Sequence, residues 1–224
     1  MSEFFLVRHG QASFGAENYD KLSPLGHQQA RWLGDYFAAR DIHFERVLIG
    51  DLVRHRETAQ SLCEALPAVP EFDIHTGLNE FDFYRISVAY LAIHPEQQPP
   101  AGASAREFYG VLKRAMQAWR RGELEGELPE TWAQFEQRVG AALSYICETK
   151  TSRPTLVVSS GGAMAMLLRH VLDFDGENVI NLNMQMKNTG VSHFYYSDTA
   201  VRLSSFNNVP HLDIDGRSDS ITFS

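Results

Sequence analysis

Short apolar runs, each ending in polar or small residues, recur along the chain. The clearest lie in Phe4–Val7, 46–50 and 155–159, and a weaker run covers 72–75. Continuous apolar runs of this length are typical of strands buried on both faces of a parallel sheet. We therefore expect a strand at each of these four places.

Helical patterns alternate with these strands. Ser23-Pro24 supplies an N-cap and a proline for the first turn of a helix that should run to about Arg40. Asp51 is expected to cap a second helix that runs to about Leu66. The order β-α-β-α predicts an α/β fold with a mostly parallel sheet and helices on both of its faces.

The pattern changes to nearly pure helix between residues 83 and 153. A helix is expected from 86 to 94, and two capping boxes, Ser104 with Glu107 and Thr131 with Gln134, each open another. About seventy residues without strands, placed between strands of one sheet, indicate a helical insertion that acts as a cap within a single domain of residues 1–224. The alternative is that these helices simply cover one face of the sheet.

The last third of the chain returns to strands. The strand at 155–159 runs directly into Ser160-Gly161-Gly162 and a helix, which is the arrangement of many anion sites. Residues 191–196 and 201–206 predict two antiparallel strands joined by a turn. The polar tail after Leu212 is expected to be loosely held.

Composition narrows the classes of partner. With 224 residues, 44% hydrophobic, the chain can bury a full core, and its net charge of -8 disfavours a general binder of nucleic acid or anionic membrane. The first residues lack a basic region and the first apolar run is too short for a signal or a membrane span, so we expect a cytoplasmic protein. Cys63 and Cys147 lie in apolar helical patterns without metal-ligand spacing, which favours buried free thiols.

Four polar stretches resemble the motifs of one family. They are Arg8-His9-Gly10, Leu22 to Ala30, Asp51 to Ala59 and Leu78-Asn79-Glu80. Their types and order resemble the histidine phosphatase superfamily, in its phosphoglycerate-mutase-like branch, over about residues 3–82 and 154–212. The resemblance implies a three-layer α/β/α fold and a substrate that is a small phosphorylated molecule or inorganic phosphate, without metal or cofactor; it leaves the oligomeric state open.

The same resemblance implies the roles of individual residues. His9 would be the nucleophile that forms a phosphohistidine, Arg8 and Arg54 would clamp the phosphoryl oxygens, and Glu80 would be the general acid. Three residues are expected to contact the substrate: Gln11, Ser160 and Gly161. Non-catalytic alternatives remain for two of these residues: Arg54 could form a surface ion pair with Glu57, and Glu80 could be a solvated loop carboxylate. Asp82 is a nearby substitute for Glu80 as the acid.

Ser160 departs from the family pattern, which places a second histidine directly before the glycine. A serine is shorter and neutral, and the loss of a charge-assisted donor can slow a phosphoryl transfer by one to three orders of magnitude. His170 lies about ten residues further along the expected helix, roughly 15 Å away, which is too far to replace that histidine. The sequence leaves four other histidines open as replacements: His27, His75, His193 and His211.

The sequence therefore predicts an intact half-site at His9 and an altered one at Ser160. The first hypothesis is a phosphatase that hydrolyses a small phosphomonoester through phosphohistidine, with reduced or altered activity. The alternative is a phosphate-binding or protein-interaction module with a degenerate catalytic site. A phosphoglycerate mutase ranks third, because the insertion lacks the basic, proline-rich segments that such enzymes use for a bisphosphate.

Overall fold

The computed structural model describes residues 1–13, 20–100 and 102–223. In this described part, six strands form one sheet in the order β3-β2-β4-β1-β5-β6. The strands are β1 (Ser2–Arg8), β2 (Arg46–Ile49), β3 (Phe72–Ile74), β4 (Thr155–Ser159), β5 (Val191–Tyr196) and β6 (Val201–Asn208). β3, β2, β4 and β1 are mutually parallel, whereas β5 pairs antiparallel with both β1 and β6. The prediction of an α/β fold with a mostly parallel sheet is confirmed.

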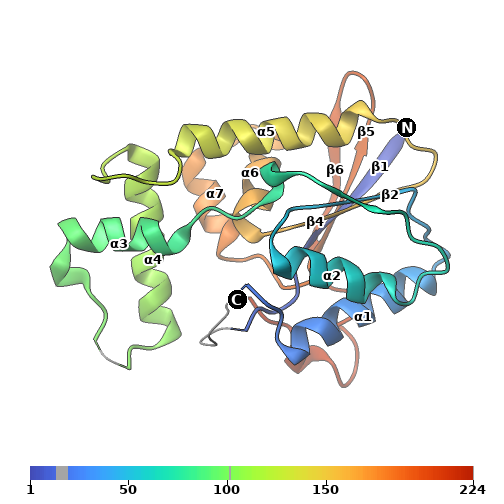
Figure 1. Ribbon diagram of the computed structural model, residues 1–224. Coiled ribbons are helices and arrows are strands. Elements are labelled where there is room, and N and C mark those ends of the chain that lie inside the picture. The colour runs from blue at the N-terminus through green and yellow to red at the C-terminus, as the bar shows by residue number, and fades with distance from the viewer. Residues whose placement is uncertain (14–19, 101, 224) are drawn as a thin grey trace.

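Alternating side chains of the central strands feed two separate cores. In β1, Phe4 and Leu6 point into one core, and Val7 points into the other. The helices α1 (Pro24–Ala38) and α2 (Val53–Cys63) cover the Val7 face. The opposite face is covered by α5 (Trp132–Glu148), α6 (Gly161–Leu172) and α7 (Gly176–Asn183), which gives three layers (Figure 1).

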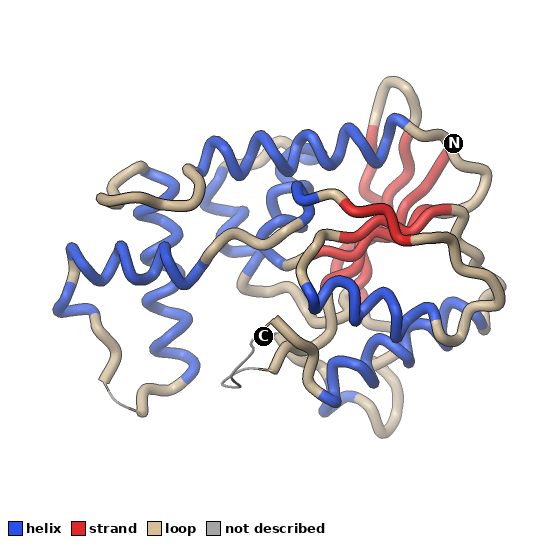
Figure 2. Tube along the Cα trace, viewed as in Figure 1, coloured by secondary structure: helices blue, strands red, loops and turns tan. Residues whose placement is uncertain are grey.

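The helices α3 (Phe83–Ile93) and α4 (Ala105–Arg121) pack against each other beside the sheet, on the left of Figure 2. Both predicted capping boxes are present, at Ser104 and Thr131, so the sequence places the starts of α4 and α5 correctly. α5 then lies along the sheet, so the segment 83–153 supplies both a helical pair at the edge and one covering helix. Its role as a cap stays a prediction.

Asp51 does not have the capping role predicted for it, and the helix α3 begins three residues earlier than expected. Asp51 does not cap α2: Leu52 occupies the N-cap, and the Val53 amide donates instead to Asp20 Oδ2 at 2.9 Å. The Asp51 carboxylate accepts from Asn79 Nδ2 at 2.5 Å, so it is engaged by the neighbouring loop. Asp82 is the N-cap of α3, so this helix begins at Phe83 and not at residue 86 as expected.

The expectation of a loosely held tail is wrong for residues 220–223. Gln29 is fully buried in α1, and its side-chain amide donates to the Ser220 carbonyl at 2.7 Å and to Thr222 Oγ1 at 2.9 Å. The Asn188 amide donates to the Thr222 carbonyl at 2.8 Å. A buried amide needs such partners, and they hold the tail against the carboxyl edge of the sheet.

Cys63 and Cys147 are both free thiols; Cys63 is buried, as predicted, whereas Cys147 is only partly buried. Burial raises their pKa values to about 12 and about 11. Among the described residues, none of the helices has both the length and the apolar character needed to cross a bilayer.

Candidate active site

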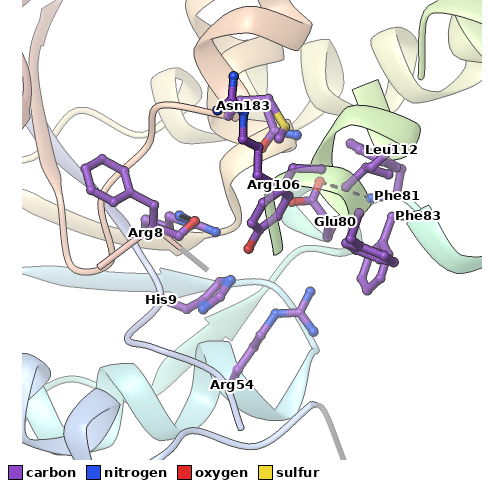
Figure 3. A pocket seen from close by; sticks show the side chains of 13 residues that line it. Arg8, His9, Arg54, Glu80, Phe81, Phe83, Arg106, Leu112 and Asn183 are labelled. Carbon is purple, nitrogen blue, oxygen red and sulfur yellow. Dashed lines mark hydrogen bonds between the residues drawn. The ribbon is translucent and has the colours of Figure 1, made fainter. Parts of the chain in front are cut away.

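Residues at or beyond the carboxyl ends of three of the parallel strands, β1, β2 and β3, line one cavity of about 370 Å³. Arg8 ends β1 and His9 follows it, Arg54 lies in the first turn of α2 after β2, and Glu80 follows the turn after β3 (Figure 3). These four residues, which the sequence predicted as catalytic, all line the cavity. The site thus has the position expected for a ligand site in an open α/β sheet.

The imidazole of His9 is held in one tautomer. Its Nδ1 lies 2.7 Å from the Gly10 carbonyl oxygen, which can only accept, so Nδ1 carries the proton and Nε2 keeps its lone pair. The His9 side chain is buried, and burial, followed by the charges of Arg54 and Arg8, holds its pKa well below the ordinary value. A neutral imidazole with a free Nε2 is a nucleophile.

The backbone around His9 is fixed from two sides. Its amide donates to the Ser159 carbonyl at 2.9 Å, and its carbonyl accepts from Asn188 Nδ2 at 3.1 Å. Thr189 follows with a left-handed φ of 52°, and His211 Nε2 contacts Thr189 Oγ1 at 2.8 Å. The Asn188–Thr189 turn and the buried His211 therefore support the position of His9.

The two arginines are buried and anchored differently. Arg8 donates from Nη1 to the carbonyls of Met186 at 2.5 Å and Phe223 at 2.9 Å, so the tail contacts it directly. Arg54 pairs with Asp20 at 2.6 Å. The alternative, a surface ion pair between Arg54 and Glu57, is absent from the ion pairs of the described residues: Arg54 is buried and pairs with Asp20, and Glu57 lies 3.8 Å from His27 Nε2.

Glu80 lies across the cavity from His9 and is held against the start of α6. Its Oε2 accepts from the Gly162 amide at 3.0 Å. A Cβ at position 162 would come within 2.2 Å of Glu80 Oε1, so only glycine permits this approach. Arg138 of α5 donates to the carbonyls of Gly77 at 3.2 Å and Asn79 at 2.8 Å and thereby fixes the loop that carries Glu80.

The three residues predicted to contact the substrate are not among the described residues that line the cavity. Gln11 accepts through Oε1 from Ser23 Oγ at 2.8 Å, which ties the loop after β1 to the start of α1. Ser160 is fully buried beside Arg54, with its Oγ 3.4 Å from Arg54 Nη2. Gly161 packs against Asn183, whose Oδ1 would lie 2.5 Å from a Cβ at position 161. Their contacts with a substrate stay predictions.

Sequence reasoning missed several residues of the site. His55, adjacent to Arg54 in the chain, lies with its ring centroid 5.9 Å from that of His9. Asp20 is the ion-pair partner of Arg54. The cavity wall also includes Arg106 and a mainly apolar set: Phe81, Phe83, Phe108, Tyr109, Leu112, Met184 and Phe223. His55 could have been noticed from its place in the Asp51–Ala59 motif; the apolar set has no local signature.

The described residues contain no group of three or more His, Cys, Asp or Glu side chains arranged to hold a metal ion.

Comparison with known proteins identifies the family. The sequence model of the histidine phosphatase superfamily (branch 1) matches residues 4–209, so the chain belongs to this superfamily. Curated relatives include the probable phosphoglycerate mutase GpmB of Citrobacter koseri, 25% identical over 211 residues that cover 89% of this chain and 87% of the relative. The protein of the same name from Salmonella arizonae is 25% identical over 95% of this chain and 96% of its own length.

Solved structures share the fold. A phosphoserine phosphatase from Entamoeba histolytica, in complex with 3-phosphoglyceric acid, superposes with a TM-score of 0.66 and 20% identity, over 95% of this chain and all (100%) of that one. A mycobacterial glucosyl-3-phosphoglycerate phosphatase, in complex with inorganic phosphate, gives 0.65 and 20% identity, over 93% and 98% of the two chains. The phosphoglycerate-mutase-like architecture predicted from the sequence is thus confirmed.

Proposed function

We propose that this protein is a phosphatase that hydrolyses small phosphomonoesters through a phosphohistidine formed on His9. One observation carries the proposal: a neutral His9, with Nδ1 tied to Gly10, lies between two buried arginines and opposite a carboxyl group in one cavity. The arginines suit a phosphoryl group, because their planar forks donate paired hydrogen bonds to its oxygens.

In the first step, the Nε2 lone pair attacks phosphorus, and a P–N bond forms as the P–O bond to the leaving alkoxide breaks. Glu80, in its protonated form, gives its proton to that alkoxide. Arg8 and Arg54 stabilise the charge that spreads over the phosphoryl oxygens in flight.

In the second step, a water molecule attacks the phosphorus of the phosphohistidine. The Glu80 carboxylate takes a proton from this water, the P–N bond breaks, and its electron pair returns to Nε2. Orthophosphate leaves, and both residues are back in their starting forms. No external co-reactant is needed beyond water.

Within this proposal, Ser160 occupies the place where the family pattern carries a second catalytic histidine. The rate is therefore expected to be reduced or the substrate range altered. The apolar cavity wall, with Phe83 and Phe108 among its members, favours substrates that carry an apolar group next to the phosphate.

A screen of phosphomonoesters, including aryl and alkyl esters, tests the proposal with wild type and His9→Ala. The expected result is turnover by wild type that falls to background in His9→Ala. A denaturing, alkaline quench with a radiolabelled substrate should retain labelled phosphate on the wild-type chain, because phosphoramidates survive base. Turnover that is unaffected by His9→Ala would refute the mechanism.

Two other functions predict different results. A binding module with a degenerate site would bind orthophosphate while turnover stays at background, which Ser160 makes the second candidate. A mutase, as the name of the curated relatives suggests, would interconvert the phosphoglycerates when primed with a bisphosphate. Interconversion would replace the hydrolase assignment.

A further inference from the structure

A histidine and a serine from distant parts of the chain form a hydrogen-bonded pair next to Arg54. His55 comes from α2, and Ser160 lies between β4 and α6; His55 Nε2 lies 2.7 Å from Ser160 Oγ. Both residues are fully buried, and Arg54 Nη2 donates to the same oxygen at 3.4 Å. The pair therefore contacts the proposed phosphoryl clamp directly, although neither residue is among those that line the cavity.

The surroundings of His55 select its tautomer. Its Nδ1 is buried and has no hydrogen-bond partner among the described residues. A proton on Nδ1 would be a buried donor without an acceptor, which is rarer and costlier than an unused lone pair. The proton therefore belongs on Nε2, which donates it to Ser160 Oγ. The ring fits because residue 50 is glycine: a Cβ there would lie 2.3 Å from Nδ1.

The Ser160 hydroxyl then has a proton to donate. Its oxygen accepts from His55 Nε2 and from Arg54 Nη2, which fills both lone pairs. Ser160 is the N-cap of α6, yet its side chain makes no capping hydrogen bond. None of the hydrogen bonds within the described part of the chain gives the hydroxyl proton an acceptor other than His55. A donor buried beside a clamp arginine requires an acceptor, and a phosphoryl oxygen supplies one.

We propose that His55 is a positioning residue that turns the Ser160 hydroxyl toward a phosphoryl oxygen held by Arg54. The inference rests on the proposed binding of a phosphoryl group between His9 and Arg54. His55 is held neutral, because burial and the Arg54 charge lower its pKa, so it keeps a single ring proton for Ser160. In this proposal, the Ser160 hydroxyl takes the place of the longer histidine donor of the family pattern, and the buried His55 orients that hydroxyl.

A double-mutant cycle on orthophosphate affinity, measured by calorimetry, tests this role without depending on turnover. Ser160→Ala should weaken phosphate binding about ten- to a hundredfold, the range for a lost hydrogen bond to a charged acceptor. His55→Phe should weaken binding roughly tenfold, because the hydroxyl is no longer directed. The double variant should bind no worse than Ser160→Ala, because His55 acts only through Ser160.

Two controls separate positioning from general damage. His27 forms a similar pair with Ser61, with His27 Nδ1 2.9 Å from Ser61 Oγ, away from the cavity, so His27→Phe should leave phosphate affinity unchanged. His55→Gln keeps a side-chain N–H donor and should recover part of the affinity lost in His55→Phe. Nitrogen NMR of histidine-labelled wild type should show the Nε2–H tautomer at His55, a result that needs no variant to fold.

Additive effects in the cycle, a full-affinity Ser160→Ala protein, or an Nδ1–H tautomer at His55 would overturn the inference while the phosphatase proposal stands. Absent turnover with a non-additive cycle would overturn the phosphatase proposal alone. Wild-type protein that does not bind phosphate would overturn both.

Discussion

At the scale of single residues, the site depends on keeping its imidazoles uncharged. His9 lies among Arg8, Arg54 and His55, and burial is the largest cause of its lowered pKa, ahead of the two guanidinium charges. A phosphohistidine mechanism needs this, because a protonated Nε2 has no lone pair with which to attack phosphorus.

The ionisation of His9 is therefore predicted to occur below pH 6.5, the ordinary value for histidine. An NMR titration of the His9 ring should show the neutral form throughout the range in which a solvated histidine protonates. Arg8→Gln removes one nearby positive charge and should raise the pKa of His9, because the cationic form is then repelled less. Arg121→Gln, at a surface ion pair with Glu123, is the matched control and should not move it. A His9 pKa at or above 6.5 in wild type would contradict the burial argument.

Placing a histidine at position 160 gives a second prediction at this scale. Ser160 has no free surface, and His55 Nε2 already lies 2.7 Å from its oxygen, so an imidazole at 160 would overlap the ring of His55. Ser160→His alone should therefore lower activity and destabilise the fold by about 1–3 kcal/mol, the range for overpacking. His55→Ala with Ser160→His removes the overlap and should recover activity relative to Ser160→His alone.

Turnover and thermal unfolding of both variants are the measurements. If Ser160→His by itself raises activity, Ser160 makes the wild-type site less active than a histidine would. If activity is unchanged or lower, the site is adapted to the pair of Ser160 and His55.

At the scale of elements, local signals predicted much of the fold. The apolar run of β1 and the capping boxes of α4 and α5 are encoded within a few neighbouring residues, so they can be seen in the sequence. The helix α7 was not predicted from the sequence. The tail was predicted to be loose because its contact partner, Gln29, is more than 190 residues away in the chain.

The candidate site shows the same division. The four predicted catalytic residues lie at or beyond strand ends, so motif and topology together placed them in one cavity: Arg8, His9, Arg54 and Glu80. The contact between His55 and Ser160 joins residues 105 positions apart and has no local sequence signature. Long-range contacts of this kind depend on packing, which a single sequence does not display.

One contact between elements leads to a third prediction. Arg138 on α5 pairs with Glu130 at 2.7 Å and donates to the carbonyls of Gly77 and Asn79, directly before Glu80. Arg138→Gln should loosen this loop and reduce kcat about tenfold on alkyl phosphates, with little change in KM, because hydrogen bonds from a charged group contribute about 1.5–3 kcal/mol.

The leaving group makes this prediction specific. p-Nitrophenolate is a good leaving group that needs little protonation. With p-nitrophenyl phosphate, the fall in kcat caused by Arg138→Gln should therefore nearly disappear. Arg121→Gln again serves as the surface control. Equal losses of kcat on the alkyl and the nitrophenyl ester would show that Arg138 supports the fold in general and not the position of Glu80.

At the scale of the whole molecule, the site is also a buried polar centre of the fold. His9, His55 and His211 are all buried, and burial is the first cause of the lowered pKa of each, with that of His211 at about 3. The folded protein therefore holds them neutral where the unfolded chain, with ordinary histidines, takes up protons.

This difference sets the sign of a last prediction. Because the unfolded state binds more protons below pH 6.5, the free energy of unfolding should fall as the pH falls through that value, by about 1.4 kcal/mol per pH unit for each histidine. For His211 the loss should continue down to about pH 3, its folded-state pKa. Urea unfolding between pH 8 and pH 5 measures the slope before most carboxylates titrate. His211→Gln should lose stability at pH 8 through its altered contact with Thr189, yet show a slope smaller by about one proton. An unchanged slope in that variant would mean that His211 is protonated in the folded protein, and the neutral hydrogen bond to Thr189 would have to be reassigned.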